Sequence, residues 1–307
     1  MPWLSLLPIF AWFAAGVVLR RSGLAGGGEG AFLFRLIFFV TLPALAFNTI
    51  VDMHISGILV LLPVSAFVVN AVCMAAAIAY LRNKALPPRN AGAVVIGAGI
   101  TNTGFMFPFA QSILGEQGLA YAILFDTGNA IFVSTVGYFV ALSYGNATST
   151  SMTASLVKTL RAPMFVAIAA AIVLNLAGVK VPDVVFRILT PLGNMTLPLI
   201  LLALGVSFSL ATLRGVLPAA TVALRMVLGF AAGLAIVFVF RPDPMFAAIL
   251  VASAAAPIGF SSVTLASVAN MDAEQATGAL SLSIAIGLFT TPLLLWALSD
   301  WFGSAAL

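Results

Sequence analysis

Charged residues are scarce in this sequence of 307 residues. Asp, Glu, Lys and Arg together make up 7% of the chain, whereas soluble domains carry about 25%. With 62% hydrophobic residues and a mean hydropathy of +1.18, the chain cannot cover a water-exposed surface with polar groups. The composition therefore excludes a soluble globular domain and predicts an integral membrane protein.

Cysteine and histidine are almost absent. The single cysteine, Cys73, excludes an internal disulfide. The single histidine, His54, has no adjacent Cys, His or Glu set, so neither a metal site nor a catalytic triad is expected. G-x-S-x-G, P-loop and H-E-x-x-H motifs are missing too. We therefore expect no enzyme activity, no cofactor and no metal.

Long apolar segments dominate what is present. A helix needs roughly 20 apolar residues to cross a bilayer. Segments of this kind lie at about 3–19, 31–51, 57–81, 91–113, 118–142, 162–178, 184–209, 214–240, 245–269 and 276–298. No basic residue precedes the first of them, so it is expected to be a membrane span rather than a signal peptide. The sequence thus predicts an all-α integral membrane protein with ten transmembrane helices.

Basic residues lie in the short connections between these segments, so the net charge of +4 does not indicate a nucleic-acid partner. If the N-terminus is outside, the inner connections and flanks hold Arg20, Arg21, Arg35, Arg82, Lys84, Arg89, Lys158, Arg161 and Arg214. The outer side holds only Lys180, Arg187 and Arg241. Since basic loops stay in the cytoplasm, we expect both termini outside.

The two halves of the chain match when one is shifted by 155 residues. Prolines coincide at Pro8 and Pro163, Pro43 and Pro198, Pro63 and Pro218, and Pro87 and Pro242, where chance predicts about 0.4 such pairs. Each half holds five expected spans, an odd number, so the second half enters the membrane inverted. We expect two inverted five-helix repeats, 1–145 and 162–307, joined by a cytoplasmic loop at 146–161.

Helix-breaking residues interrupt the fourth and ninth segments. The stretch GITNTGFMFPF at 99–109 has its counterpart, SAAAPIGFSSVT, at 253–264. Each break leaves a half-helix N-terminus that attracts anions, and matched breaks in an inverted repeat indicate a transport site, although one alone can be a structural kink. We assign the breaks to Gly104, Pro108, Pro257 and Gly259. The expected substrate site is Thr101, Asn102, Thr103, Gly104, Asn129, Pro257, Ile258 and Gly259.

Two charges lie well inside expected spans. Asp126 is a candidate for binding the coupling proton, with Asn129 on the same helix face; the alternative is that Asp126 braces the opened fourth span. Arg225 stays charged, so it needs a counter-ion, carbonyls or an anionic substrate. It can pair with Asp126, bind substrate or reach the membrane interface. The repeat places Asn70 at the position that matches Arg225.

Three stretches resemble the auxin efflux carrier family in its bacterial branch: TNTGFMFPFA, FDTGNAIF and APIGFSSVTLASVANMDAE. The resemblance covers essentially the whole chain. It implies a fold similar to bile-acid sodium symporters and sodium/proton antiporters, in which broken helices 4 and 9 cross near Pro108 and Pro257. Spans 1, 2, 6 and 7 would form a scaffold, while spans 3–5 and 8–10 would form a transport unit that moves like an elevator.

Members of that family move organic anions such as auxin, malate or malonate, with the carboxylate near asparagines such as Asn102 and Asn129. Phe107 departs from the family pattern, in which a small residue often precedes the span-4 proline. The long central loop of the plant branch is missing, so auxin itself is not the expected cargo. The bacterial branch implies the inner cell membrane as the location.

These features predict a secondary active transporter of small carboxylates that works by alternating access, coupled to protons or driven by the membrane potential. A sodium-coupled or uncharged-solute transporter on the same fold is one alternative. A membrane receptor that binds without transport is another. The expected partners are a small carboxylate and the lipid bilayer, with a possible homodimer through the second and seventh helices, which carry TLP motifs.

Overall fold

The structure is a computed structural model that describes residues 4–145, 151–209 and 216–304. Its first half contains η1 (Leu4–Leu6), α1 (Leu7–Arg21), α2 (Gly27–Leu36), η2 (Ile37–Thr41), α3 (Leu42–Val51), η3 (Gly57–Val60), α4 (Leu61–Leu81), α5 (Pro88–Gly99), α6 (Thr103–Phe132), η4 (Val133–Gly137) and α7 (Tyr138–Tyr144). The second half contains α8 (Met152–Leu160), α9 (Pro163–Leu176), α10 (Asp183–Asn194), α11 (Thr196–Ser207), α12 (Val216–Phe240), α13 (Pro244–Ala254), α14 (Phe260–Val268) and α15 (Ala273–Ser304).

The described chain is a multi-pass, all-α membrane protein, as predicted. Six of its helical segments are long and apolar enough to cross a membrane, or seven if the pair Thr153–Leu160 and Pro163–Leu176, bent by 58°, is one span. This number is below ten because several expected spans are shorter or divided. Helix α5 has 12 residues and α13 has 11, since each ends at a break.

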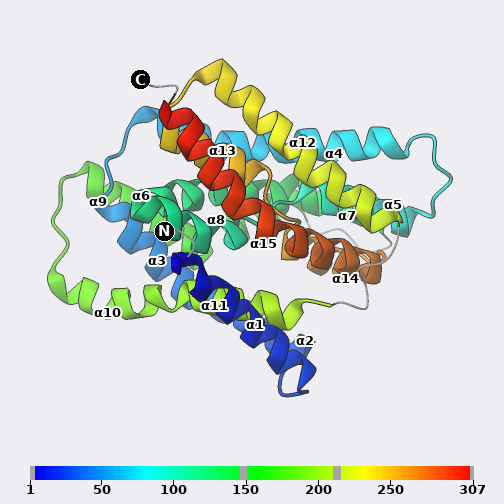
Figure 1. The fold of residues 1–307 in the computed structure, drawn as a ribbon, viewed down its shortest axis with the longest axis horizontal. Helices are drawn as coiled ribbons and strands as arrows, with labels where there is room; N and C mark the ends of the chain where they lie inside the picture. Colours follow the sequence, from blue (N-terminus) through cyan, green and yellow to red (C-terminus); the bar gives the residue numbers. More distant parts are fainter. Residues whose placement is uncertain (1–3, 146–150, 210–215, 305–307) are drawn as a thin grey trace.

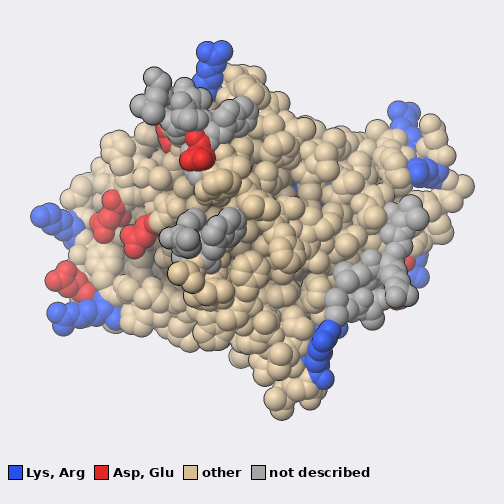
Figure 2. All heavy atoms as spheres, viewed as in Figure 1, with Lys and Arg blue, Asp and Glu red and all other residues tan. Residues whose placement is uncertain are grey.

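Large apolar side chains cover the outside of the molecule. Val239 is 74% exposed, Phe289 67% and Phe139 63%. Figure 2 shows charged side chains gathered toward opposite sides of the protein, with a broad uncharged surface between them. Such a surface would be insoluble in water, and it fits a bilayer whose hydrocarbon core is about 30 Å thick.

The helices pack as two groups that lie next to each other (Figure 1). In the first group α1 packs on α11, which also contacts α2, while α3 packs on α9 and α10. In the second group α4 packs on α5, α6 and α12, and α13 packs on α12, α15 and α6. Helix α6 joins the groups through its contacts with α3 and α11.

Left-handed backbone turns recur at the interval of 155 residues. Gly23 has a φ of 75° and Gly178 a φ of 63°. Gly115, which divides α6 into two helices, has a φ of 70°, and Asn270 after α14 has a φ of 58°. Side chains other than Gly and Asn rarely adopt this conformation. The expected boundary between the fourth and fifth spans therefore lies inside the segment labelled α6.

Helices α1 and α11 approach each other closely at two glycines. A Cβ atom on Gly16 would lie only 2.9 Å from Cα of Gly205 and would overlap the carbonyl of Leu202. A Cβ atom on Gly205 would overlap the carbonyl of Phe13. Small residues allow this contact because helices in a membrane associate largely through close packing.

Gly205→Ala should therefore lower the thermal unfolding temperature in detergent, because overpacking a tight contact costs about 1–3 kcal/mol. Gly28→Ala is the matched control: its added methyl group meets open space, and alanine favours a helix over glycine by up to about 1 kcal/mol. Equal unfolding temperatures for Gly205→Ala and the wild type would contradict the close contact.

Candidate functional site

Two interrupted helices cross in the middle of the second group. Helix α5 ends at Gly99 and α6 begins at Thr103, while α13 ends at Ala254 and α14 begins at Phe260. The two interruptions run side by side as an isolated antiparallel bridge between Thr101 and Ile258. The two breaks predicted from the sequence therefore meet in space.

Backbone hydrogen bonds hold this crossing together. The Asn102 amide donates to the Pro257 carbonyl at 2.8 Å, and the Gly259 amide donates to the Ile100 carbonyl at 2.9 Å. The Ile258 amide donates to Oγ of Ser283 at 3.1 Å. Backbone groups released inside a membrane must find protein or water partners, and each break supplies partners for the other.

Local residues explain where the helices stop and restart. Pro257 has no N–H and cannot continue the hydrogen-bond ladder of α13. Oδ1 of Asn102 accepts a hydrogen bond from the Phe105 amide at 3.2 Å, which makes Asn102 the N-cap of α6. Of the four predicted break residues, Pro257 and Gly259 lie in an interruption.

The other two predicted break residues do not. Gly104 is the second residue of α6, and Pro108 lies within the same helix. The assignment of the break to Gly104 and Pro108, and of the crossing to Pro108, is therefore wrong by several residues. The Asn102 cap sets the start of α6, and the helix continues past Pro108 to a kink at Gly115.

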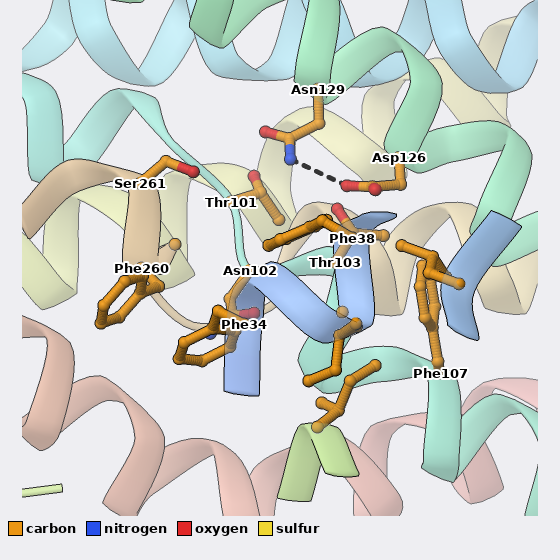
Figure 3. Close-up of a pocket in the computed structure, with 15 residues that line it drawn as sticks. Phe34, Phe38, Thr101, Asn102, Thr103, Phe107, Asp126, Asn129, Phe260 and Ser261 are labelled. Carbon is orange, nitrogen blue, oxygen red and sulfur yellow. Dashed lines mark hydrogen bonds between the residues drawn. The ribbon is translucent and has the colours of Figure 1, made fainter. Parts of the chain in front are cut away.

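A small pocket of about 60 Å³ opens where α6 and α14 begin, enough for a few water molecules. Its polar lining includes six of the eight predicted substrate residues: Thr101, Asn102, Thr103, Gly104, Asn129 and Gly259. The other two, Pro257 and Ile258, belong to the crossing but not to the lining. Asp126 and Phe107 also line the pocket, together with Phe34, Ile37, Phe38, Leu42, Ile200, Phe260 and Ser261 (Figure 3).

Both half-helix N-termini contribute to this pocket. Thr103 and Gly104 form the first turn of α6, while Phe260 and Ser261 form the first turn of α14. Unpaired N–H groups and the helix dipole give each end a partial positive charge. Nδ2 of Asn102 is buried, with no hydrogen-bond partner in the described part of the chain, while the buried hydroxyl of Thr103 interacts with the Asp126 carboxyl. The pocket therefore presents two positive helix ends and free amide donors, with the Asp126 carboxyl as the one acidic group of its lining.

The two half-helix C-termini meet a buried arginine instead. Nη2 of Arg225 donates to the Ala254 carbonyl at 2.5 Å, and Nη1 donates to the Ala98 carbonyl at 3.4 Å. Helix C-termini carry partial negative charge, so a cation between them stabilises both. Arg225 is fully buried. It binds backbone carbonyls, which were among the partners considered for it.

Asparagine side chains connect this arginine to the pocket. Nη1 of Arg225 donates to Oδ1 of Asn70 at 2.9 Å, and Nδ2 of Asn70 donates to Oδ1 of Asn129 at 2.9 Å. Nδ2 of Asn129 donates to Oδ1 of Asp126 at 3.0 Å (Figure 3). The two asparagines lie between the charges, so a relay takes the place of the direct pair of Arg225 and Asp126, which was one of the three roles considered.

Comparison with known proteins identifies the family of this chain. A family model described as membrane transport protein matches residues 3–295. The chain belongs to this family. It is 26% identical to an uncharacterised transporter of Methanothermobacter thermautotrophicus over 296 residues, which cover 94% of this chain and 96% of the relative. It is also 26% identical to an uncharacterised transporter of Methanocaldococcus jannaschii over 207 residues, covering 65% and 66% of the two chains.

Membership in the membrane transport protein family confirms the resemblance to auxin efflux carriers over nearly the whole chain. The protein is therefore a membrane transporter. Sequence reasoning missed the apolar walls of its pocket, above all the stacked rings of Phe34 and Phe260, whose centroids lie 4.4 Å apart. The chain has 24 phenylalanines, so an aromatic side chain by itself did not indicate that these positions belong to a site.

Arg225→Gln should destabilise this transporter, because it leaves two helix C-termini without their shared cation. Breaking a buried charged contact costs about 3–5 kcal/mol, so the unfolding temperature in detergent should fall. Cys73, whose Sγ lies 3.9 Å from the Arg225 carbonyl oxygen, is buried and should become more reactive toward thiol reagents. Arg82→Gln, at an exposed arginine, is the control. Unchanged stability and thiol reactivity would show that Arg225 does not hold the crossing.

Proposed function

We propose that this transporter is a secondary active carrier of small organic anions, carboxylates of the size of malate or malonate, that works by alternating access. One observation carries the proposal: two helix N-termini and the unpaired, buried amide donors of Asn102 converge on a single pocket. Helix N-termini are effective anion sites because their N–H groups and dipoles both favour negative charge. The bound carboxylate supplies the acceptors that these donors lack.

The pocket walls fit a short carbon skeleton. Phe34, Phe38 and Phe260 contribute aromatic rings to the lining, and Phe107, which also lines the pocket, is fully buried. Apolar walls with a few placed donors are typical of small-molecule sites. The small volume favours acids of few carbons over indole-sized acids such as auxin.

Asp126 supports coupling to protons. Its carboxyl is in the pocket and is nearly buried, at 8% exposure. An ionised carboxylate there repels an incoming carboxylate, whereas a protonated one does not. Anion and proton then bind together, and the pair crosses the membrane with less net charge than the anion alone. The alternative role of Asp126, bracing α6, needs no proton.

Sodium coupling has less support. A cation on this fold would bind at the carbonyl ends of the broken helices, and the Ala98 and Ala254 carbonyls already accept hydrogen bonds from Arg225. A fixed guanidinium supplies the positive charge there without an ion from solution. A proton gradient or the membrane potential is therefore the proposed driving force. A receptor that binds without flux gains no support from two matched helix breaks.

Repeated contacts support two inverted five-helix repeats, 1–145 and 162–307, and ten spans. Nη1 of Arg20 donates to the Val206 carbonyl, and Nδ2 of Asn175, 155 residues after Arg20, donates to the Val51 carbonyl, 155 residues before Val206. The contact of α1 with α11 is thus matched by that of α9 with α3. The left-handed turns at Gly23 and Gly178, and at Gly115 and Asn270, recur at the same interval.

The two helix groups support an elevator movement. The first group (α1, α2, α3, α9, α10 and α11) corresponds to the proposed scaffold, and the second carries the crossing. We further propose that both termini are outside the bacterial inner membrane, with the connecting segment 146–161 in the cytoplasm. This segment was expected to be a loop, and it contains helix α8. Residues 146–150 of the segment, and Arg214, lie outside the described residues. A homodimer through the TLP-bearing helices remains part of the proposal.

Asn102→Ser tests the anion site. Serine can still cap α6 but lacks the amide donors, and a hydrogen bond to a charged group contributes about 1.5–3 kcal/mol. When proteoliposomes that contain this variant are assayed for uptake of labelled malate and malonate, the KM for the transported acid should rise by about 10- to 100-fold. Asn48→Ser, which alters an amide that donates to Thr190 and does not line the pocket, should transport like the wild type. No flux of any organic anion in the wild type would refute the proposed function.

Uptake measured under imposed gradients of H⁺ and Na⁺ identifies the driving force. Uptake of malonate should increase when the outside is acidified and should not change when Na⁺ is replaced by K⁺. Asp126→Asn cannot be ionised, so uptake by this variant should continue without responding to the pH gradient. A dependence on Na⁺ would reject the proton-coupled scheme in favour of the sodium-coupled alternative.

A further inference from the structure

A second, larger cavity lies beside the candidate substrate pocket. Its volume is about 830 Å³, and its lining includes Phe38, Asp126, Ala154, Lys158 and Arg161. Phe38 and Asp126 line both cavities. These two residues therefore lie on the boundary between the two spaces.

We propose that this cavity, here called the basic vestibule, is the entrance through which the anion reaches the pocket, and that Lys158 and Arg161 attract it. The inference rests on the proposed transport of organic anions. It adds two specificity-determining residues that lie in the segment between the two halves of the chain rather than in the crossing.

The charges of the vestibule favour an anion. Lys158 and Arg161 are exposed, and they are three residues apart at the C-terminal end of α8, which places them on one side of the helix. Asp126, at the inner end, is the single acidic residue of the lining. A concave surface with one sign of charge raises the local concentration of opposite charges and can increase association rates by 10-fold or more.

The vestibule is an aqueous space rather than a gap filled by lipid. Two cationic side chains and the α8–α9 turn border it, and charged groups and irregular backbone do not face the hydrocarbon core. Helix α8 continues into α9 across a bend of 58°, which places its basic end over the vestibule. At the inner end, Phe38 belongs to the π-helical turn η2, and such turns are frequent at functional sites.

A structural role for the two basic residues predicts something different. Cations at a helix C-terminus stabilise the helix through its dipole. Neutralising them would then lower stability but would not change how an anion approaches. The salt dependence of uptake separates the two roles, because steering by exposed charges weakens as ions screen it over about 10 Å at 0.1 M.

The first experiment measures transport by the double variant Lys158→Gln/Arg161→Gln in proteoliposomes. At low ionic strength its KM for malonate should rise by about 3- to 10-fold with little change in maximal rate, and the difference from wild type should shrink at high salt. The matched control, Arg82→Gln/Lys84→Gln, removes two exposed basic residues elsewhere and should behave like wild type. Equal KM values at low salt for wild type and the Lys158/Arg161 variant would overturn the inference.

The second experiment needs no transport. Cys73 is the single cysteine, so Cys73→Ala provides a background for Ala154→Cys in the vestibule wall. A thiosulfonate reagent carrying a sulfonate should label this cysteine faster than one of equal length carrying an ammonium group. The ratio of the two rates should fall by about 3-fold or more in the Lys158→Gln/Arg161→Gln background. An unchanged ratio would reject the positive vestibule even if anion transport is established, whereas wild-type protein without flux would reject the proposed function alone.

Discussion

The structure depends on one constraint: backbone polar groups interrupted inside a membrane must be satisfied by protein or water. A single broken helix could not meet it. Here the breaks around Thr101 and Ile258 pair with each other, and the crossing that results places two N-termini on one side and two C-termini on another. The position of the candidate pocket at the two N-termini and that of the buried Arg225 at the two C-termini are consequences of that arrangement.

Sequence reasoning could predict that the helices break and that the breaks are partners. Proline and glycine are local signals, and the interval of 155 residues links them across the chain. It could not place the first residue of α6, because Pro108 is the stronger breaker in isolation while the cap by Asn102 sets the start. Helix starts depend on which side chain reaches a free amide, and that is decided by three-dimensional packing.

The buried charges show the same limit. The sequence identified Arg225, its matching residue Asn70, and Asp126 as polar groups that need partners. It did not show that Arg225 and Asn70 touch, because residues 155 positions apart meet only where folding brings their two helices together. The aromatic walls of the pocket had no signal either, since apolar residues occur everywhere in a membrane protein and only folding selects those beside a site.

The relay from Arg225 to Asp126 has a fixed direction. A guanidinium has donors only, so Asn70 must turn its oxygen toward Arg225, where that atom also accepts from the Thr101 hydroxyl at 2.7 Å. Its NH₂ group then faces Asn129, whose own NH₂ group must face Asp126. Both amide dipoles therefore point from the cation toward the carboxyl, and the NH₂ group of Asn129 donates to Oδ1 of Asp126. Oδ1 of Asp126 is thus held as an acceptor, so the orientation of the hydrogen bond to this carboxyl is set by a cation two amides away.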